Sequence, residues 1–120
     1  MSPPNQQNKY WLDLLHNGAE ALPVVTESGA ALTLTSAHAG RYVRCTHATP
    51  TVAVAKDATQ PMPQAAEITL EASGGTITVA AASGVTINSP GGSLASSAQY
   101  GVLTLKHTAL DTWTLMGALA

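Results

Sequence analysis

The pattern of apolar and polar positions changes its period near residue 19. In residues 5–18, NQQNKYWLDLLHNG, the aromatic and leucine side chains recur at helical spacing, and Asn17-Gly18 provides residues that commonly end a helix. We therefore predict one short helix over roughly residues 5–17. So short a helix is marginal in water and must bury an apolar stripe against another surface. The contact residues predicted for this stripe are Tyr10, Trp11, Leu12 and Leu15.

From Ala19 onward the apolar positions alternate, and the fifteen Thr of the chain, with clusters of Val and Ile, favour pleated strands over helices. Glycines and prolines fall between the alternating runs, where turns need them. We predict a mainly β fold, an antiparallel β-sandwich, a jelly-roll-like domain or a barrel. The eight predicted strands span residues 31–35, 41–46, 51–55, 67–71, 76–80, 84–87, 100–107 and 112–116.

Two short stretches within this pattern are near copies of each other, TITV at residues 76–79 and GVTI at residues 84–87. Such an echo is also what a coil of a β-helix would produce. A solenoid needs three or more repeats, and the sequence shows only one echo. We therefore interpret the two stretches as neighbouring strands.

The chain divides into two parts on this evidence. Residues 1–28 form an amino-terminal arm with the short helix, a docking or swapped segment, and residues 29–120 form the β domain. Two connections, residues 56–66 and 88–99, are longer than hairpin turns. Prolines and small polar residues predict that both loops are exposed, where contacts with partners tend to be made.

Charge is the unusual part of the composition. Only 10% of the 120 residues are charged, against about 25% in average domains, and only five are Lys or Arg. So few cations argue against a nucleic-acid partner, whose phosphates must be neutralised. A surface this poor in charge is expected to be buried in an assembly, because soluble monomers depend on surface charge.

Neither a membrane span nor a secretory leader is predicted, because no apolar run reaches about 18 residues and the polar amino terminus lacks a basic start. Cys45, the single cysteine, cannot form an intrachain disulfide.

Four histidines, at positions 16, 38, 47 and 107, are candidate metal ligands. Cys45 and His47 are two residues apart, which on a strand places both side chains on one face. A zinc site usually takes three or four protein ligands, and the spacing here supplies no such set. We expect no metal and no cofactor, although one histidine per chain near a threefold axis is an alternative source of three ligands.

Catalytic patterns are equally weak. The string PGGS at residues 90–93 does not form the elbow that presents a nucleophilic serine, and we interpret it as a turn. Glu67 and Glu71 flank one short strand and are expected to be solvent-facing charges rather than a glycosidase pair. We predict that the protein is not an enzyme.

Arg41 and Arg44 lie close together on one predicted strand, and His47 follows them. Both arginines are either solvated or paired with Glu67 or Glu71, or one of them forms an ion pair between subunits. These three residues are the predicted inter-subunit contacts. On the last two strands we expect Tyr100 and Trp113 to pack together across a hairpin.

Residues 30–120 carry a resemblance to a known protein family. They resemble a small β domain that recurs in virion proteins of tailed bacteriophages, both in tail-fibre modules and in head decoration (cement) or head-fibre proteins. The residues that carry the resemblance are Gly40, Ile77, Val79, GVTIN at 84–88, Gly91-Gly92, Gln99-Tyr100, Leu103, Leu105, Trp113 and Gly117.

The resemblance implies a structural protein on the capsid surface of the virion, without catalytic residues. Decoration proteins of this kind typically work as trimers on threefold positions of the capsid, so the implied partners are two further copies and the major capsid protein. A chain of 120 residues with its own Met1 is closer to a decoration protein than to a fibre module. The alternative is a fibre or tip module that recognises a host surface glycan through residues 56–66 or 88–99.

Overall fold

The computed structural model describes residues 23–120, and these residues form a mainly β fold of nine strands. The predicted helix over residues 5–17, with Tyr10, Trp11, Leu12 and Leu15, lies outside the described residues. All eight predicted strands are present within a few residues of their expected bounds. The mainly β prediction is therefore confirmed, and the strands form a two-sheet sandwich whose strand pairs are mostly parallel rather than antiparallel.

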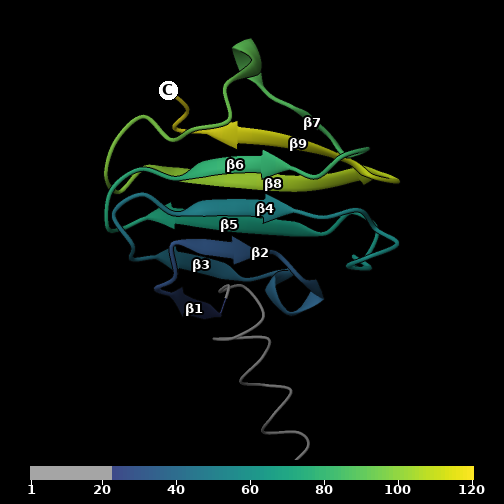
Figure 1. The fold of residues 1–120 in the computed structure, drawn as a ribbon, viewed down its shortest axis with the longest axis horizontal. Helices are drawn as coiled ribbons and strands as arrows, with labels where there is room; N and C mark the ends of the chain where they lie inside the picture. Colours follow the sequence, from purple (N-terminus) through teal and green to yellow (C-terminus); the bar gives the residue numbers. More distant parts are fainter. Residues whose placement is uncertain (1–22) are drawn as a thin grey trace, which may run out of the picture.

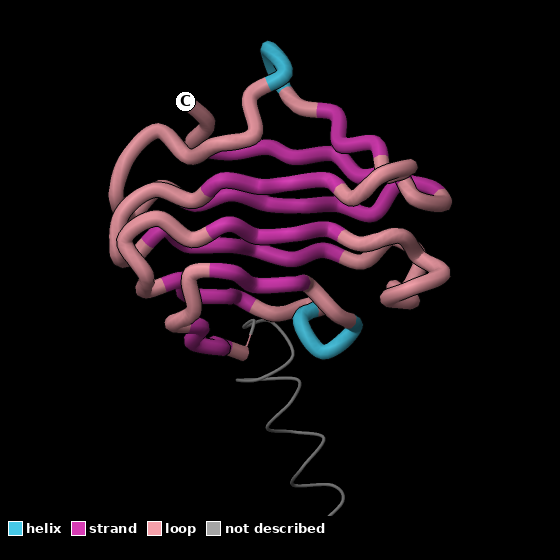
Figure 2. The backbone as a smooth tube through the Cα atoms, in the orientation of Figure 1, coloured by secondary structure: helices cyan, strands magenta, loops and turns pink. Residues whose placement is uncertain are grey.

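Two sheets build this sandwich (Figure 1). The larger sheet has the strand order β1-β3-β5-β8-β9-β7 and the smaller sheet has the order β2-β4-β6. The strands are β1 (Val24–Glu27), β2 (Ala31–Thr33), β3 (Tyr42–Cys45), β4 (Thr51–Val54), β5 (Glu67–Ala72), β6 (Thr78–Ala81), β7 (Thr86–Asn88), β8 (Val102–Ala109) and β9 (Thr112–Gly117). Two 3-10 turns, η2 (Ser36–His38) and η3 (Pro90–Gly92), lie at opposite ends of the stack (Figure 2).

Strict alternation explains which side chains form the core. In β8 the residues Leu103 and Leu105 are fully buried while Thr104 between them is only partly covered, and β5 and β9 alternate in the same way. Because successive side chains of a strand point to opposite faces, each strand sends one row inward. The inward rows of both sheets meet in one cluster that contains Val43, Val52, Val54, Ile68, Leu70, Ile77, Val79, Trp113 and Leu115.

The pairing of the strands differs from the prediction, because five of the seven strand pairs are parallel. Only β5 with β8 and β8 with β9 are antiparallel. The chain alternates between the sheets from β1 to β6, so β1-β2, β3-β4 and β5-β6 form three successive coils. The echo at residues 76–79 and 84–87 therefore does not mark neighbouring strands, since β6 and β7 lie in different sheets.

The turns that join the two sheets stack as closely as the strands do. In the β5–β6 turn, Ser73 and Gly74 donate their backbone N–H groups to the Cys45 carbonyl, and the Thr76 N–H donates to the Ala48 carbonyl. A Cβ atom on Gly75 would lie 1.9 Å from the Ala48 oxygen. Only glycine allows two backbones to approach this closely, so this turn fixes the spacing between the second and third coils.

The two ends of the stack are covered differently. At one end the β8–β9 hairpin extends the larger sheet, and residues 94–96 run beside β6, where Val79 donates its N–H to the Leu94 carbonyl. At the other end β1 and β2 are the edge strands of the two sheets. Within residues 23–120 nothing pairs with their outer edges.

β1 also moves the boundary of the β domain. Residues 24–27 were assigned to the amino-terminal arm, yet Val25 and Glu27 pair in parallel with Val43 and Cys45 of β3. The sheet therefore begins before residue 29, and β1 escapes prediction because its two valines are adjacent and do not alternate with polar residues. No helix among the described residues is long and apolar enough to cross a membrane.

The stacked turn gives a first prediction. Replacing Gly75 by Ala should destabilise the domain by about 1–3 kcal/mol or more, since the new methyl group collides with backbone that cannot move without opening the ladder. The matched control is Gly29→Ala in the β1–β2 turn, where the nearest atom to the new Cβ is 3.3 Å away. Urea unfolding of both variants measures the difference. Equal midpoints would show that the turns do not set the coil spacing.

Candidate functional site

The outer face of the larger sheet holds two groups of paired polar side chains. Arg44 on β3 and Glu71 on β5 form an ion pair of 3.4 Å, and the Tyr42 hydroxyl donates a 2.6 Å hydrogen bond to the same carboxylate. A second pair joins Lys106 on β8 to Glu67 on β5 at 3.3 Å. The structure thus places Arg44 beside Glu71, one of the two partners considered for it.

The hydrogen bond to Glu71 raises the pKa of Tyr42 above its ordinary value, with burial and the negative charge of Glu71 acting in the same direction. Arg44 opposes this shift. The phenol therefore stays protonated and works as a donor that orients the carboxylate.

The other predicted contact residues are dispersed. Arg41 is exposed and precedes β3. His47 lies in the β3–β4 turn, where its Nδ1 accepts the backbone N–H of Thr49 at 3.1 Å. Because β3 ends at Cys45, His47 lies outside the strand. Cys45 and His47 therefore do not share a strand face as predicted. Inter-subunit roles for Arg41, Arg44 and His47 stay predictions.

Cys45 itself points into the core, and burial, together with the nearby negative charges, raises the pKa of its thiol to about 11. A thiol in this state is neutral at physiological pH and unreactive as a nucleophile. Among residues 23–120 no cluster of three or more potential ligands could hold a metal ion.

His38 is a buried histidine, and each of its ring nitrogens has a hydrogen-bond partner. Its Nδ1 accepts the backbone N–H of Thr35 at 3.0 Å, and its Nε2 faces the Glu27 carboxylate at 3.1 Å. One nitrogen must therefore accept and the other donate. This pair fastens η2 to β1.

The most concentrated polar cluster joins the 56–66 loop to the β8–β9 hairpin. The His107 Nε2 lies 2.9 Å from the Asp57 Oδ2, and its Nδ1 lies 2.9 Å from the carbonyl oxygen of Pro63. Asp57 and Asp111 also exchange bonds, since each backbone N–H donates to the other carboxylate, at 2.7 and 2.9 Å. The side chains of His107 and Asp57 are 6% and 13% exposed.

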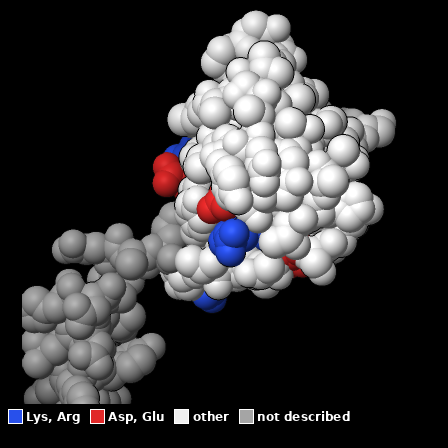
Figure 3. All heavy atoms as spheres, turned by 90° about the vertical axis from the view of Figure 1, so that its left-hand side faces the viewer, with Lys and Arg blue, Asp and Glu red and all other residues white. Residues whose placement is uncertain are grey.

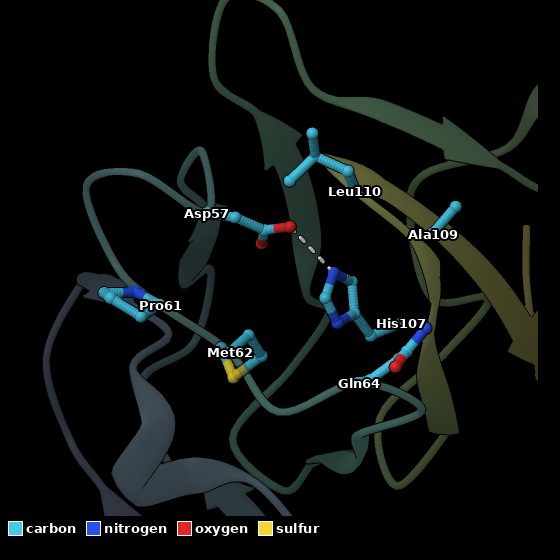
Figure 4. A pocket seen from close by; sticks show the side chains of 7 residues that line it. All are labelled: Asp57, Pro61, Met62, Gln64, His107, Ala109 and Leu110. Atoms are coloured by element: carbon cyan, nitrogen blue, oxygen red, sulfur yellow. Dashed lines mark hydrogen bonds and ion pairs between the residues drawn. The ribbon is translucent and has the colours of Figure 1, made fainter.

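This cluster forms one wall of a cavity of about 300 Å³ (Figure 4). The loop and the hairpin turn face each other across it, with the His107–Asp57 bond at its side. Most of the remaining lining is apolar or uncharged: Pro61, Met62, Gln64, Ala109 and Leu110. The cavity can hold a small group, but it presents no nucleophile beside a base.

The outer face of the smaller sheet carries no charge at all. Alternation sends Leu32, Val52 and Val79 inward, and the outward positions of β2, β4 and β6 are only alanine and threonine. Figure 3 looks at the end of the sandwich on the left of Figure 1 and shows the few charged groups of that view gathered toward one side. The outward residues of the smaller sheet are Ala31, Thr33, Thr51, Ala53, Thr78 and Ala80, and we call this surface the Ala/Thr face.

Sequence reasoning missed the His107 cluster, although one signal was present. His107 has the same phase as Leu103 and Leu105, so alternation predicts that it points inward. Asp57 lies in a proline-rich loop with no period, and nothing in the sequence brings it to β8. The expected contact of Tyr100 with Trp113 is wrong, because Tyr100 is 64% exposed and Trp113 stacks on His107, with 4.7 Å between ring centroids.

Comparison of the chain with protein-family models, with curated proteins and with solved structures gives no match.

The hydrogen bond between Tyr42 and Glu71 on the larger sheet gives a second prediction. Replacing Glu71 by Gln removes the charge that disfavours the Tyr42 phenolate, so the pKa of Tyr42 should fall toward its ordinary value. An ultraviolet titration of the tyrosines measures this shift. Glu67→Gln is the matched control on the same strand, and it should leave the titration of Tyr42 unchanged. An unchanged pKa of Tyr42 in Glu71→Gln would contradict the hydrogen bond between Tyr42 and Glu71.

Proposed function

We propose that this chain is a bacteriophage capsid decoration (cement) protein, a trimer that binds the outer surface of the head and stabilises it. The proposal combines the resemblance of residues 30–120 to virion β domains with the distribution of charge over the described surface. It assigns the protein a structural role without catalysis, and its partners are two further copies of the chain and the major capsid protein.

The Ala/Thr face is the observation that carries the proposal. Its six outward side chains are small and uncharged, and they project from one three-stranded sheet. Such a face can be buried without leaving a charge unpaired and without restricting the motion of long side chains. Interfaces between permanent subunits are depleted of charge in the same way. The low charge of the whole chain then has an explanation, because a face that is covered needs no ions for solubility.

The open edges of β1 and β2 support the docking role of the arm. These edges lie at the end of the sandwich where the described residues begin. Unpaired strand edges can form hydrogen bonds with other chains, so proteins cover these edges or use them to bind partners. In the proposal the arm, with Tyr10, Trp11, Leu12 and Leu15, contacts the capsid next to this end.

A charge on the Ala/Thr face tests the assembly. Ala53→Lys should dissociate the trimer while the domain stays folded, because each copy would bury an uncompensated ammonium. Ala37→Lys is a matched control, since Ala37 is exposed on η2 and outside both sheets. Mass measurement in solution and circular dichroism read out assembly and folding. A trimer that survives Ala53→Lys places the subunit contact on another face.

The arm is tested separately. A chain lacking residues 1–18 should keep the β fold and lose attachment to capsids, since the fully buried core residues among residues 23–120 run from Leu34 to Leu115. The assay is co-sedimentation with heads that lack the protein, and the copy number in virions gives an independent reading. Hundreds of copies per particle fit decoration. Full attachment of the shortened chain would overturn the role of the arm.

A second candidate function is a fibre or tip module that binds a host glycan. One observation favours it: Tyr100 follows the 88–99 loop with its ring largely exposed and its backbone in the left-handed region, at a φ of 66°. Strained, exposed aromatic residues are typical of ligand contacts. Antibody labelling confined to the tail, with glycan binding lost in Tyr100→Ala or Asn88→Ala, would select this function.

A further inference from the structure

We propose that His107 is held as a doubly protonated imidazolium and acts as a pH-sensitive latch that fastens the 56–66 loop to the β8–β9 hairpin. The inference stands on the hydrogen-bond geometry around the ring and does not depend on the proposed function. It concerns a cluster that no part of the virion hypothesis uses.

The two ring nitrogens of His107 both face groups that can only accept. The carbonyl oxygen of Pro63 has no hydrogen to give, and the carboxylate of Asp57 already takes the backbone N–H of Asp111 on the same oxygen. Two bonds of 2.9 Å to two acceptors need two N–H donors on the ring. A neutral imidazole has one N–H, so it can make only one of these bonds.

His38 shows the opposite arrangement within the same domain. Its Nδ1 receives the N–H of Thr35, so only Nε2 needs a hydrogen. Protonation of His38 on Nδ1 would set two donors against each other. The two buried histidines are therefore expected to differ by one proton at the same pH, although each has a carboxylate partner.

Charge balance around the ring points the same way. The other oxygen of Asp57, Oδ1, is buried and has no hydrogen-bond partner among the described residues. An ionised carboxylate in this position is costly without a cation beside it. His107 is the group bonded to it, and the Trp113 ring, 4.7 Å from the imidazole centroid, adds a cation–π contact.

The remaining charged groups near the latch do not replace the imidazolium. From the hairpin turn, Asp111 adds a second carboxylate to the cluster. In the loop, Lys56 turns its ammonium toward Gly84. On β8 and β5, Lys106 and Glu67 pair on the outer face of the sheet, opposite to the inward His107. Loss of the ring proton therefore leaves the cluster with two carboxylates.

Rising pH opens the latch in this scheme. Removal of the second ring proton takes away one of the two N–H donors that the bonds to Pro63 and Asp57 require. Once it is lost, either the Pro63 carbonyl or the Asp57 carboxylate faces a bare nitrogen lone pair. The loop then loses one of its two bonds to the His107 ring, while the bond from the His107 backbone N–H to the Ala66 carbonyl remains, and the cavity beside the ring widens.

The first experiment reads the protons directly. Ring-nitrogen NMR of the full chain, between about pH 5 and 8, should show two protonated nitrogens for His107 over pH values where His38 shows one protonated and one bare nitrogen. His38 is thus an internal standard that needs no variant. A bare nitrogen on His107 throughout this range would overturn the proposal.

The second experiment reads the loop. The backbone amides of Asp57 and Asp111 are bonded across the latch, and their hydrogen-exchange protection should fall about ten- to a hundredfold when His107 loses its proton, since a charge-assisted bond is lost. In His107→Gln the protection should be low at every pH, without a step. The control His38→Gln should keep the step, because it alters a different buried histidine.

Asp57→Asn separates a latch from a merely structural contact. The variant keeps the size of the side chain and removes the charge that holds the second proton. His107 should then show a single protonated nitrogen near neutral pH, even if the loop stays folded. Two protonated nitrogens in Asp57→Asn would overturn the role of the carboxylate, and an unchanged exchange profile across the pH range would overturn the latch itself.

Discussion

The fold depends on the stacking of one coil on the next through backbone hydrogen bonds. Parallel ladders join β1 to β3 to β5 in one sheet and β2 to β4 to β6 in the other, and the turns between the sheets continue the same ladders. The β5–β6 turn follows the β3–β4 turn so closely that a side chain on Gly74 or Gly75 has no space. Because the turns lie on one another, the inward rows of Val, Ile and Leu also align, and one core forms.

This stacking also decides where charge is tolerated. Within residues 23–120 each carboxylate side chain is matched by a partner: Glu67 by Lys106, Glu71 by Arg44 and Tyr42, and Glu27 by His38. Asp57 and Asp111 are matched by His107 and by each other's backbone amides. Each of these pairs thus joins two different elements of the fold. The Ala/Thr face lies outside these pairs, and it is uncharged because its outward positions are alanine and threonine.

The strands themselves could be predicted, because alternation is a local property that short windows of sequence reveal. Their parallel pairing could not, since paired residues are 18 positions apart between Val24 and Tyr42 but 27 apart between Tyr42 and Thr69. The 56–66 loop makes the spacing between paired strands unequal, so the sequence lacks the regular repeat that would predict stacked coils. The same loop carries Asp57 to His107, so the polar cluster was hidden for the same reason. The pairing of Arg44 with Glu71 was one of the predicted alternatives, because a chain with few charges offers few partners.

The β8–β9 hairpin indicates the order in which the strands of this domain fold. Its strands are separated only by Leu110 and Asp111, whereas all other paired strands are joined across long stretches of sequence. Closing a short loop costs less chain entropy than closing a long one, so local pairs form early and distant parallel pairs form late. We expect folding to start at the carboxy-terminal hairpin, to recruit β5 onto β8, and then to wind the earlier coils onto this template one after another. A chain synthesised from its amino terminus would then hold its coils unpaired until the last residues emerge.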